Sequence, residues 1–330
     1  MKIFSKNQWK LLLLDNIILI LILIVVIGMW IAKPVFMSLN NILNIFRSMS
    51  IRGVIAFGMT MVILSGQIDL SVGSIIGLSG VIVAWACKFL PGILGVSVTV
   101  SCIMGIVAAV VLAVAVGCFH GYMQHRFTMP SFIVTLATQL LLYGLAGLIC
   151  GGFPISSVFP DWFITVGFGR IGPVPIPAII LVVSFLIVMF IVNYTNIGRS
   201  IYAVGGNEEA ARLSGINVLR TKIVSFVTVA LLATLSGLMN SAQVLSATYS
   251  FGRGWEIDVI SAVVIGGTSM GAGIGKISGT FLGVLFLGVM INGMTLLDIS
   301  LYMQYVIRGI LLFSSVLLSI FLPKLKQKMY

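Results

Sequence analysis

The chain has 330 residues, of which 59% are hydrophobic and only 8% are charged, and its formal net charge is +11. A soluble domain carries roughly 25% charged residues, so this composition excludes a sizeable soluble domain. The positive charge does not indicate nucleic acid binding, because the basic residues lie in short loops and at the termini. We expect an all-α polytopic membrane protein whose residues 1–330 form one transmembrane domain in the lipid bilayer.

Long runs without charge predict the membrane segments, since a spanning helix needs about 20 apolar residues. Cutting the sequence at charges, prolines and glycine clusters predicts about 10 transmembrane segments, at 11–31, 53–66, 70–88, 93–117, 130–149, 175–195, 223–243, 257–271, 277–297 and 303–322. The first segment is too long for the apolar part of a signal peptide, and no small-residue cleavage site follows it. We therefore expect it to be a retained helix.

The distribution of Lys and Arg predicts the orientation, because cytoplasmic loops are enriched in these residues. With both termini inside, the outer side carries only Lys33, Lys88, Arg170 and Arg253. The inner side then carries Lys2, Lys6, Lys10, Arg126, Arg199, Arg212, Arg220, Lys222, Lys276, Lys324, Lys326 and Lys328. The sequence therefore predicts an N-in, C-in topology. We expect Arg308, inside the last segment, to snorkel to the outer interface.

The stretch Gly58–Gly80 places a single carboxylate, Asp69, inside a run of membrane length. An ionisable group in a membrane segment is costly and usually faces the bundle interior or a watery pathway. The glycines beside it predict a broken helix near 66–70. Asp69 either caps the second half-helix or contacts a solute directly. The candidate pathway residues are Ser65, Gln67, Asp69 and Ser71.

A second short segment, 257–271, precedes another glycine-rich break near 271–276. Paired short, interrupted segments in the two halves of a transporter point towards a binding site. Glu256 and Asp258 open this segment from the outer side, and with Arg253 they are candidates for an outer mouth. Their alternative role is to complement the dipole of the following helix.

Glycines recur every four residues at Gly271, Gly275, Gly279 and Gly283. On a helix they form a flat stripe, which predicts close helix packing within the chain or across a dimer. The run GAGIGKIS is not a phosphate-binding loop, because Met270 stands where the first glycine belongs and Ile277 where Ser or Thr belongs. We expect this chain to bind no ATP.

Neither the cysteines nor the histidines form a pattern that indicates metal binding or catalysis. Cys87, Cys102, Cys118 and Cys150 lie in or beside apolar segments without CxxC spacing, so we expect small buried side chains. His120 and His125 have no acid or thiol at a ligand spacing, and we expect them to mark a helix end at the cytoplasmic surface. The chain is thus expected to be neither an enzyme nor the holder of a metal or cofactor.

The longest hydrophilic stretch, 196–222, contains signals for a short helix. Asn207 is a suitable N-cap, acidic residues follow it, and Gly215 is suited to the position after the helix end. These signals predict a helix of about two turns over 207–215 at the cytoplasmic face. It is either a surface anchor or a rigid knob that docks on a partner.

Several motifs carry a resemblance to a known family. Glu209-Ala210-Ala211, followed after three residues by Gly215, matches the EAAxxxG core of the cytoplasmic loop in ABC importer permeases. The stretches GRxIYAVGGNEEAARLSGI, GMTxVIL, IDLSVGS, MPSFIVTLAT, WEID and AVVIGGTS closely resemble permeases of ribose-type monosaccharide importers, within the broad branched-chain amino acid/sugar permease family. The likeness covers about residues 50–320 in the same order. Gln67 and His120 depart from the family pattern, so the identity of the sugar does not carry over.

The resemblance implies a multi-pass permease of the bacterial plasma (inner) membrane that moves a pentose, a hexose or a related small polyol. It implies a second permease copy, identical or related, and a delivery protein that is periplasmic or lipid-anchored. It also implies a separate ATP-binding subunit, which holds ATP and Mg and docks on Asn207, Glu208, Glu209, Ala210, Ala211 and Gly215 of a coupling loop at 196–222.

Two alternatives stay open at this point. A branched-chain amino acid ABC permease shares the coupling loop. An ion-coupled secondary transporter would use Asp69 as a proton or sodium site and would need no such loop.

Overall fold

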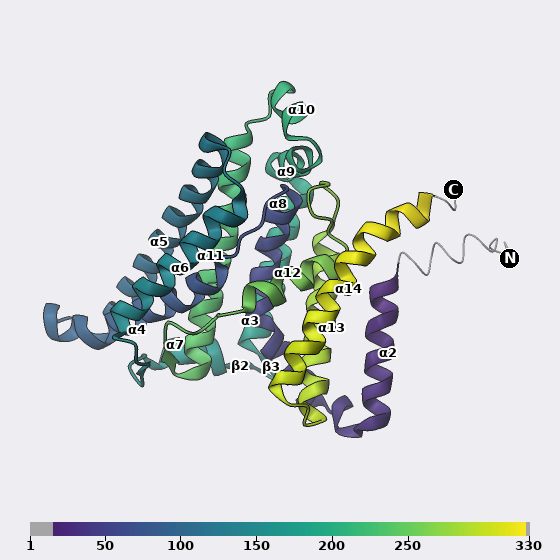
Figure 1. Cartoon of the computed structure of the whole chain (residues 1–330). Helices are drawn as coiled ribbons and strands as arrows, with labels where there is room; N and C mark the ends of the chain where they lie inside the picture. The colour runs from purple at the N-terminus through teal and green to yellow at the C-terminus, as the bar shows by residue number, and fades with distance from the viewer. Residues whose placement is uncertain (1–15, 328–330) are drawn as a thin grey trace.

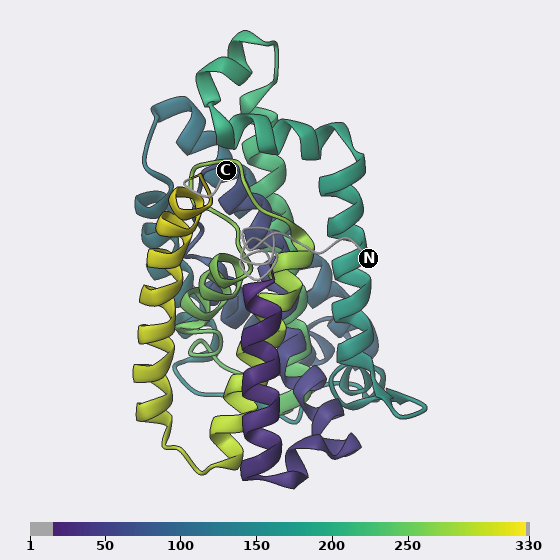
Figure 2. The same cartoon turned by 90° about the vertical axis from the view of Figure 1, so that its right-hand side faces the viewer.

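The computed structural model describes residues 16–327, except for the side chains at 318–320 and 322–327. Some predicted features lie outside the described residues, namely the start of the first segment at 11–15 and Lys2, Lys6, Lys10 and Lys328. Within the described part, long helices run side by side and a short helix, α10, projects from one end (Figures 1 and 2).

Most of the described chain is helical. The helices are α2 (Ile17–Ala32), the 3-10 turn η1 (Pro34–Met37), α3 (Leu39–Leu64), α4 (Val72–Leu94), α5 (Val98–Phe127), α6 (Ser131–Cys150), α7 (Asp161–Phe168), α8 (Ile176–Tyr194), α9 (Asn196–Gly206), α10 (Glu208–Leu213), α11 (Val218–Val244), α12 (Trp255–Ile265), α13 (Ile277–Leu296) and α14 (Leu301–Gln327). Four strands of two residues each lie in the loops and form two antiparallel pairs. In these pairs β1 (Ile155–Ser156) pairs with β4 (Ser246–Ala247), and β2 (Arg170–Ile171) pairs with β3 (Val174–Pro175).

Among the described residues, seven helices are long and apolar enough to cross a membrane, namely α3, α4, α5, α6, α8, α11 and α13. Shorter apolar helices lie at Ile17–Ala32 and Leu301–Leu317. The predicted class, an all-α polytopic membrane protein, is therefore confirmed. The number of ten crossings stays a prediction, because it depends on the short helices as well.

The predicted short segment 53–66 is wrong in length. It is the second half of α3, which has 26 residues and begins after Ser38, whose hydroxyl accepts a hydrogen bond from the Asn41 N–H at 3.3 Å. The prediction cut the segment at a charge, Arg52, but this guanidinium pairs with Asp258 at 3.2 Å inside the bundle. A charge with a partner does not need to end a membrane helix.

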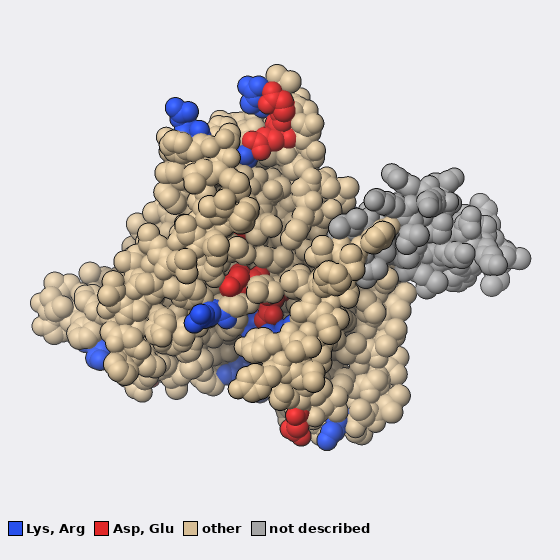
Figure 3. All heavy atoms as spheres, viewed as in Figure 1, with Lys and Arg blue, Asp and Glu red and all other residues tan. Residues whose placement is uncertain are grey.

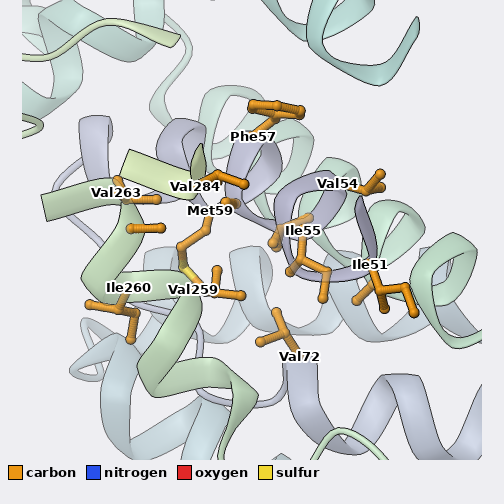
Figure 4. Packing of buried hydrophobic residues seen from close by; sticks show 14 of the residues in the cluster. Ile51, Val54, Ile55, Phe57, Met59, Val72, Val259, Ile260, Val263 and Val284 are labelled. Atoms are coloured by element: carbon orange, nitrogen blue, oxygen red, sulfur yellow. The ribbon is translucent and has the colours of Figure 1, made fainter. Parts of the chain in front are cut away.

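Helix α3 is the centre of the hydrophobic core. Its residues from Val54 to Leu64 are all buried, and they pack on residues of α12 and α13 such as Val259, Val263 and Val284 (Figure 4). Gly58 permits close approach to α11, because an added Cβ would lie 2.7 Å from the Cα of Val229. Between membrane helices, close van der Waals packing of this kind replaces the hydrophobic driving force.

Both predicted breaks are present. The first separates α3 from α4 at 65–71, and the second separates α12 from α13 at 266–276, five residues earlier than predicted. The second begins early because Gly266 is followed by Gly267 in the left-handed region (φ +85). The breaks meet at Gly205 of α9, where an added Cβ would overlap the carbonyl oxygen of Leu64 and lie 3.1 Å from the Cα of Gly273.

The predicted four-glycine stripe is wrong for its first half. Gly271 has φ +69 and, like Gly275, lies in the 266–276 connection and not on a helix. Gly279 and Gly283 do lie on α13, where added Cβ atoms would overlap the carbonyl oxygens of Gly266 and Ala262. Only these two members pack helix on helix, and they do so within the chain. As predicted, Cys87, Cys102 and Cys150 are buried, but Cys118 is partly exposed.

Candidate functional site

The break between α3 and α4 leaves backbone N–H groups that a membrane interior must satisfy. Helix α6 supplies two of the acceptors. The N–H of Ile68 donates to Ser131 Oγ and that of Leu70 to Thr135 Oγ1, both at 3.1 Å. The N–H of Ser71 donates to Asp69 Oδ1 at 2.8 Å. The break is therefore held by two side chains of α6 and by its own carboxylate.

Asp69 has no exposed surface, and its first oxygen is fully engaged. Besides the Ser71 N–H, Oδ1 accepts a hydrogen bond from the Ser71 hydroxyl at 2.6 Å. A carboxylate that binds the backbone two residues ahead is an Asx-type turn, and here the turn leads directly into α4. Ser71, and not Asp69, is the N-cap residue of α4. The observed contacts are those of a turn that starts the half-helix.

The second oxygen of Asp69 faces His120, with 3.7 Å between Oδ2 and Nδ1. The prediction that His120 marks a helix end at the surface is wrong, because α5 continues to Phe127 and only 1% of His120 is exposed. Its ring lies 5.5 Å from that of Phe226. Pattern reasoning missed this neighbour because the two residues are far apart in the chain.

The predicted pathway residues do gather at the first break, but all four are buried. Ser65 Oγ donates to the carbonyl of Val62 at 2.8 Å, and Gln67 accepts a hydrogen bond from Gln124 of α5. Their polar atoms thus contact protein in this conformation. A role for Ser65, Gln67, Asp69 and Ser71 in solute contact stays a prediction.

One polar face of α6 was missed by the sequence analysis. Ser131, Thr135, Gln139 and Tyr143 recur every four residues and so share one side of the helix, which we name the α6 polar stripe. Its first two members bind the break at 68–70. Farther along, Gln139 Nε2 donates to Glu256 Oε1 at 3.0 Å. The spacing of polar residues in a charge-free run was the signal that would have found it.

The three candidates for an outer mouth have separate surroundings. Arg253 is exposed in the loop before α12, whereas Glu256 and Asp258 are 8% and 6% exposed in its first turn. Glu256 contacts Gln139. Asp258 Oδ2 pairs with Arg52 Nε of α3 at 3.2 Å and with Arg308 Nη1 of α14 at 2.9 Å.

The prediction that Arg308 snorkels to the outer interface is therefore wrong. Its side chain is 15% exposed, bonds both oxygens of Asp258 and lies over the ring of Tyr305 at 4.8 Å. An internal carboxylate offsets much of the cost of burying the guanidinium, so the side chain does not need to reach water. On the face shown in Figure 3, charged side chains gather in the middle, where α12 lies, and over α10.

The predicted helix at 207–215 is confirmed as α10. The Asn207 side chain accepts a hydrogen bond from the Ala210 N–H at 2.9 Å, and Gly215 has φ +81 after the helix end. The N–H of Ile216 then donates to the carbonyl of Ala211 at 3.1 Å, which closes the C-terminus. The sequence did not predict α9, which occupies the first part of the 196–222 stretch.

One face of α10 is fixed and the other is exposed. Glu208 pairs with the buried Lys222 of α11 at 2.6 Å, and Ala211 packs in a small apolar cluster. On the exposed face, Arg212 bonds Glu209 at 2.6 Å, and this hydrogen bond holds the pKa of the Glu209 carboxyl below its usual value. Leu213 is 75% exposed. The helix projects from the end of the bundle (Figure 2), and its exposed side chains are both charged and apolar.

These features define a class of protein. Interrupted helices that meet inside a membrane bundle, with polar groups at the interruptions, are typical of transport proteins. Among the described residues, no group of three or more His, Cys, Asp or Glu side chains is arranged to hold a metal ion.

Comparison with known proteins gives the family. Residues 41–316 match the family described as "Branched-chain amino acid transport system / permease component", and the chain belongs to this family. It is a permease component of an ABC transporter and a multi-pass protein of the bacterial plasma (inner) membrane.

Several relatives are similar over most of their length. The ribose import permease protein of Escherichia coli (strain K12) is 38% identical over 308 residues, which cover 92% of each chain. That of Bacillus subtilis (strain 168) is 39% identical over 89% of each chain. The L-arabinose transport system permease protein of Escherichia coli (strain K12) is 34% identical over 89% of this chain and 87% of its own. No solved structure matches the chain.

Proposed function

We propose that this chain is the membrane-spanning subunit of an ATP-driven importer that moves a monosaccharide across the plasma membrane. The substrate is a pentose, a hexose or a related small polyol. The observation that carries the proposal is the similarity to ribose and L-arabinose permeases over about nine-tenths of the chain. The two interrupted helices and the projecting α10 support it, because they are the parts such a permease needs.

Coupling to ATP is proposed to act through α10, with Asn207, Glu208, Glu209, Ala210, Ala211 and Gly215 as the residues that build it. The exposed Glu209, Arg212 and Leu213 offer charge and apolar surface to a separate ATP-binding subunit. The ion pair of Glu208 with Lys222 joins α10 to α11, which packs on α3, α4 and α5. A displacement of α10 would therefore be transmitted through α11 to α3 and α4, which flank the first break.

Such a gate needs contacts that differ between its two states. ATP and Mg would bind the partner subunit, and this chain would hold no cofactor. The tip of α10 is the place where partner contacts would change with nucleotide.

The topology proposed is ten crossings with both termini inside, over a single domain at 1–330. The strand β2, which carries Arg170, lies at the end opposite α10 (Figure 1). The connection that carries Lys276 lies at the α9 side, since the Tyr202 hydroxyl donates to the Gly275 carbonyl at 2.9 Å. These positions agree with the excess of Lys and Arg expected at the cytoplasmic side.

The remaining partners follow from the same proposal. A second permease copy, identical or related, would complete the pathway, and a periplasmic or lipid-anchored protein would deliver the sugar. Because that protein selects the solute, the permease does not need to bind it tightly.

The test is uptake by proteoliposomes that hold this chain with its ATP-binding subunit and delivery protein. ATP-dependent uptake of labelled ribose or L-arabinose is the expected result. The chain alone, with a proton or sodium gradient, should give none. The name of the family keeps a branched-chain amino acid permease as the second candidate. Loss of leucine uptake with intact sugar uptake, on deletion of the chain, would favour that candidate and overturn the sugar assignment.

A further inference from the structure

The carboxylate of Glu256 is buried, but only one of its two oxygens accepts a hydrogen bond. The residue is 8% exposed, and Oε1 accepts a hydrogen bond from Gln139 Nε2 at 3.0 Å. Oε2 has no hydrogen-bond partner among the described residues. It lies beside the first turn of α4, because a Cβ added at Gly73 would be 2.5 Å from it. A buried acceptor without a donor is costly, so this oxygen is suited to a ligand that supplies one.

Tyr143 is the next member of the α6 polar stripe after Gln139. Its hydroxyl is also buried and also makes no hydrogen bond in the described structure. It lies one helical turn from Gln139, whose amide donates to Glu256. Two unused polar groups from different helices, α6 and α12, are therefore neighbours.

Two glycines next in sequence to this site have free space around them. Side chains added at Gly144 of α6 or at Gly254 before α12 would meet nothing within 4 Å. Tyr249 is 37% exposed and its ring lies beside Gly147 of α6. Small-molecule sites combine an apolar or aromatic wall with a few placed polar groups, and these elements are present here.

We propose that Glu256, Gln139 and Tyr143 form a contact site for the hydroxyl groups of the transported monosaccharide. The inference rests on the proposed function and names its solute-binding residues. A sugar hydroxyl both donates and accepts, so it can donate to Glu256 Oε2 and accept from the Tyr143 hydroxyl. The Asp69 carboxylate differs, because Oδ1 accepts two hydrogen bonds within the turn and Oδ2, although it also has no hydrogen-bond partner among the described residues, faces His120 at 3.7 Å.

A structural role for the same residues makes a different prediction. If Glu256 and Gln139 only join α12 to α6, the Tyr143 hydroxyl contributes little, because it has no partner of good hydrogen-bond geometry among the described residues, although Gln139 lies near it. Removing an unpaired buried hydroxyl should then leave the protein unchanged or slightly more stable. Tyr143→Phe therefore separates the two roles, and it is conservative enough to fold.

The experiment measures ribose and L-arabinose uptake by the complete transporter in proteoliposomes, for wild type and Tyr143→Phe. Loss of one hydrogen bond to the solute should raise the KM for delivered sugar roughly three- to tenfold. The control is Thr138→Val on the same helix, whose hydroxyl donates to the carbonyl of Val134 at 2.9 Å. It should leave KM unchanged.

A second variant, Glu256→Gln, keeps the shape and replaces the free acceptor by an amide. We expect it to change the ratio of KM values for ribose and 2-deoxyribose, which differ by one hydroxyl. Equal KM values and ratios for wild type, Tyr143→Phe and Glu256→Gln would overturn this inference and leave the sugar assignment intact. A wild-type transporter that takes up no pentose or hexose overturns the proposed function, and the inference with it.

Discussion

The first break and the start of α12 both bury carboxylates, but they use them differently. Asp69 bonds the turn that contains it, and hydroxyls of α6 complete the break. Asp258 instead joins α3 to α14 through Arg52 and Arg308. Glu256, two residues away, keeps one oxygen without a partner. Asp69 Oδ2 also has no hydrogen-bond partner among the described residues, but it faces His120 at 3.7 Å. Neither burial nor an unpaired oxygen therefore marks a solute site by itself; the groups that face the oxygen decide.

The comparison also separates local from long-range stabilisation. The contacts of Asp69 Oδ1 lie within two residues and would form wherever this turn forms. Those of Asp258 exist only when helices distant in sequence have assembled. Substitutions at the two positions should therefore differ in size and in the part of the protein that they disturb.

The largest effect is expected for Asp258→Ala. It leaves the Arg52 and Arg308 guanidiniums facing each other without a carboxylate, and breaking a buried pair in this way costs about 3–5 kcal/mol. We expect that loss in the free energy of unfolding, measured by SDS titration of the purified chain. Because Asp258 is the partner that holds Arg308, limited proteolysis should cleave α14 early.

The control for this substitution is Asp161→Ala, which removes an exposed acid from the first turn of α7. It should cost no more than about 1 kcal/mol. Equal losses for the two variants would mean that the ion pairs of Asp258 contribute nothing beyond a surface charge.

A smaller loss is expected for Asp69→Ala. The Ser71 N–H and hydroxyl lose their acceptor in a buried turn, which costs about 2–3 kcal/mol of unfolding free energy. Asp69→Asn keeps an oxygen at the same place and should recover most of that loss in the same SDS titration. If Asn is as damaging as Ala, the charge facing His120 matters more than the turn.

These two regions show what the sequence was able to predict. The break near Asp69 and the caps of α10 at Asn207 and Gly215 were predictable, because each depends on residues within about one turn. The pairing of Asp258 with Arg52 and Arg308 was not, since it joins residues 206 and 50 positions away (258 − 52 and 308 − 258). The predicted short segment at 53–66 failed for the same reason.

The place where the two interrupted regions touch offers the next test. In Gly205→Ala the added methyl would overlap the Leu64 carbonyl at the end of α3 and crowd Gly273 in the second break. Overpacking of this kind costs about 1–3 kcal/mol. We expect reduced stability in SDS and slower sugar uptake, because both breaks must shift. Gly206→Ala is the matched control, since nothing lies within 4 Å of its added Cβ.

The smallest effect on stability, and a large one on assembly, is expected for Glu209→Gln. The residue is exposed and its partner Arg212 lies on the same helix, so the free energy of unfolding should stay almost unchanged. Binding of the ATP-binding subunit, measured by co-purification, should fall severalfold if Glu209 is part of the docking surface.

Docking should also depend on pH, because the ionised carboxylate of Glu209 is the form that binds, and its hydrogen bond with Arg212 lowers its pKa. The contribution of Glu209 to docking is therefore complete at any pH above the ordinary carboxyl pKa, near 4.3. It is lost only when the pH falls through the lowered pKa of this carboxyl. Undiminished co-purification of Glu209→Gln would remove this residue from the docking surface and leave Leu213 to be tested next.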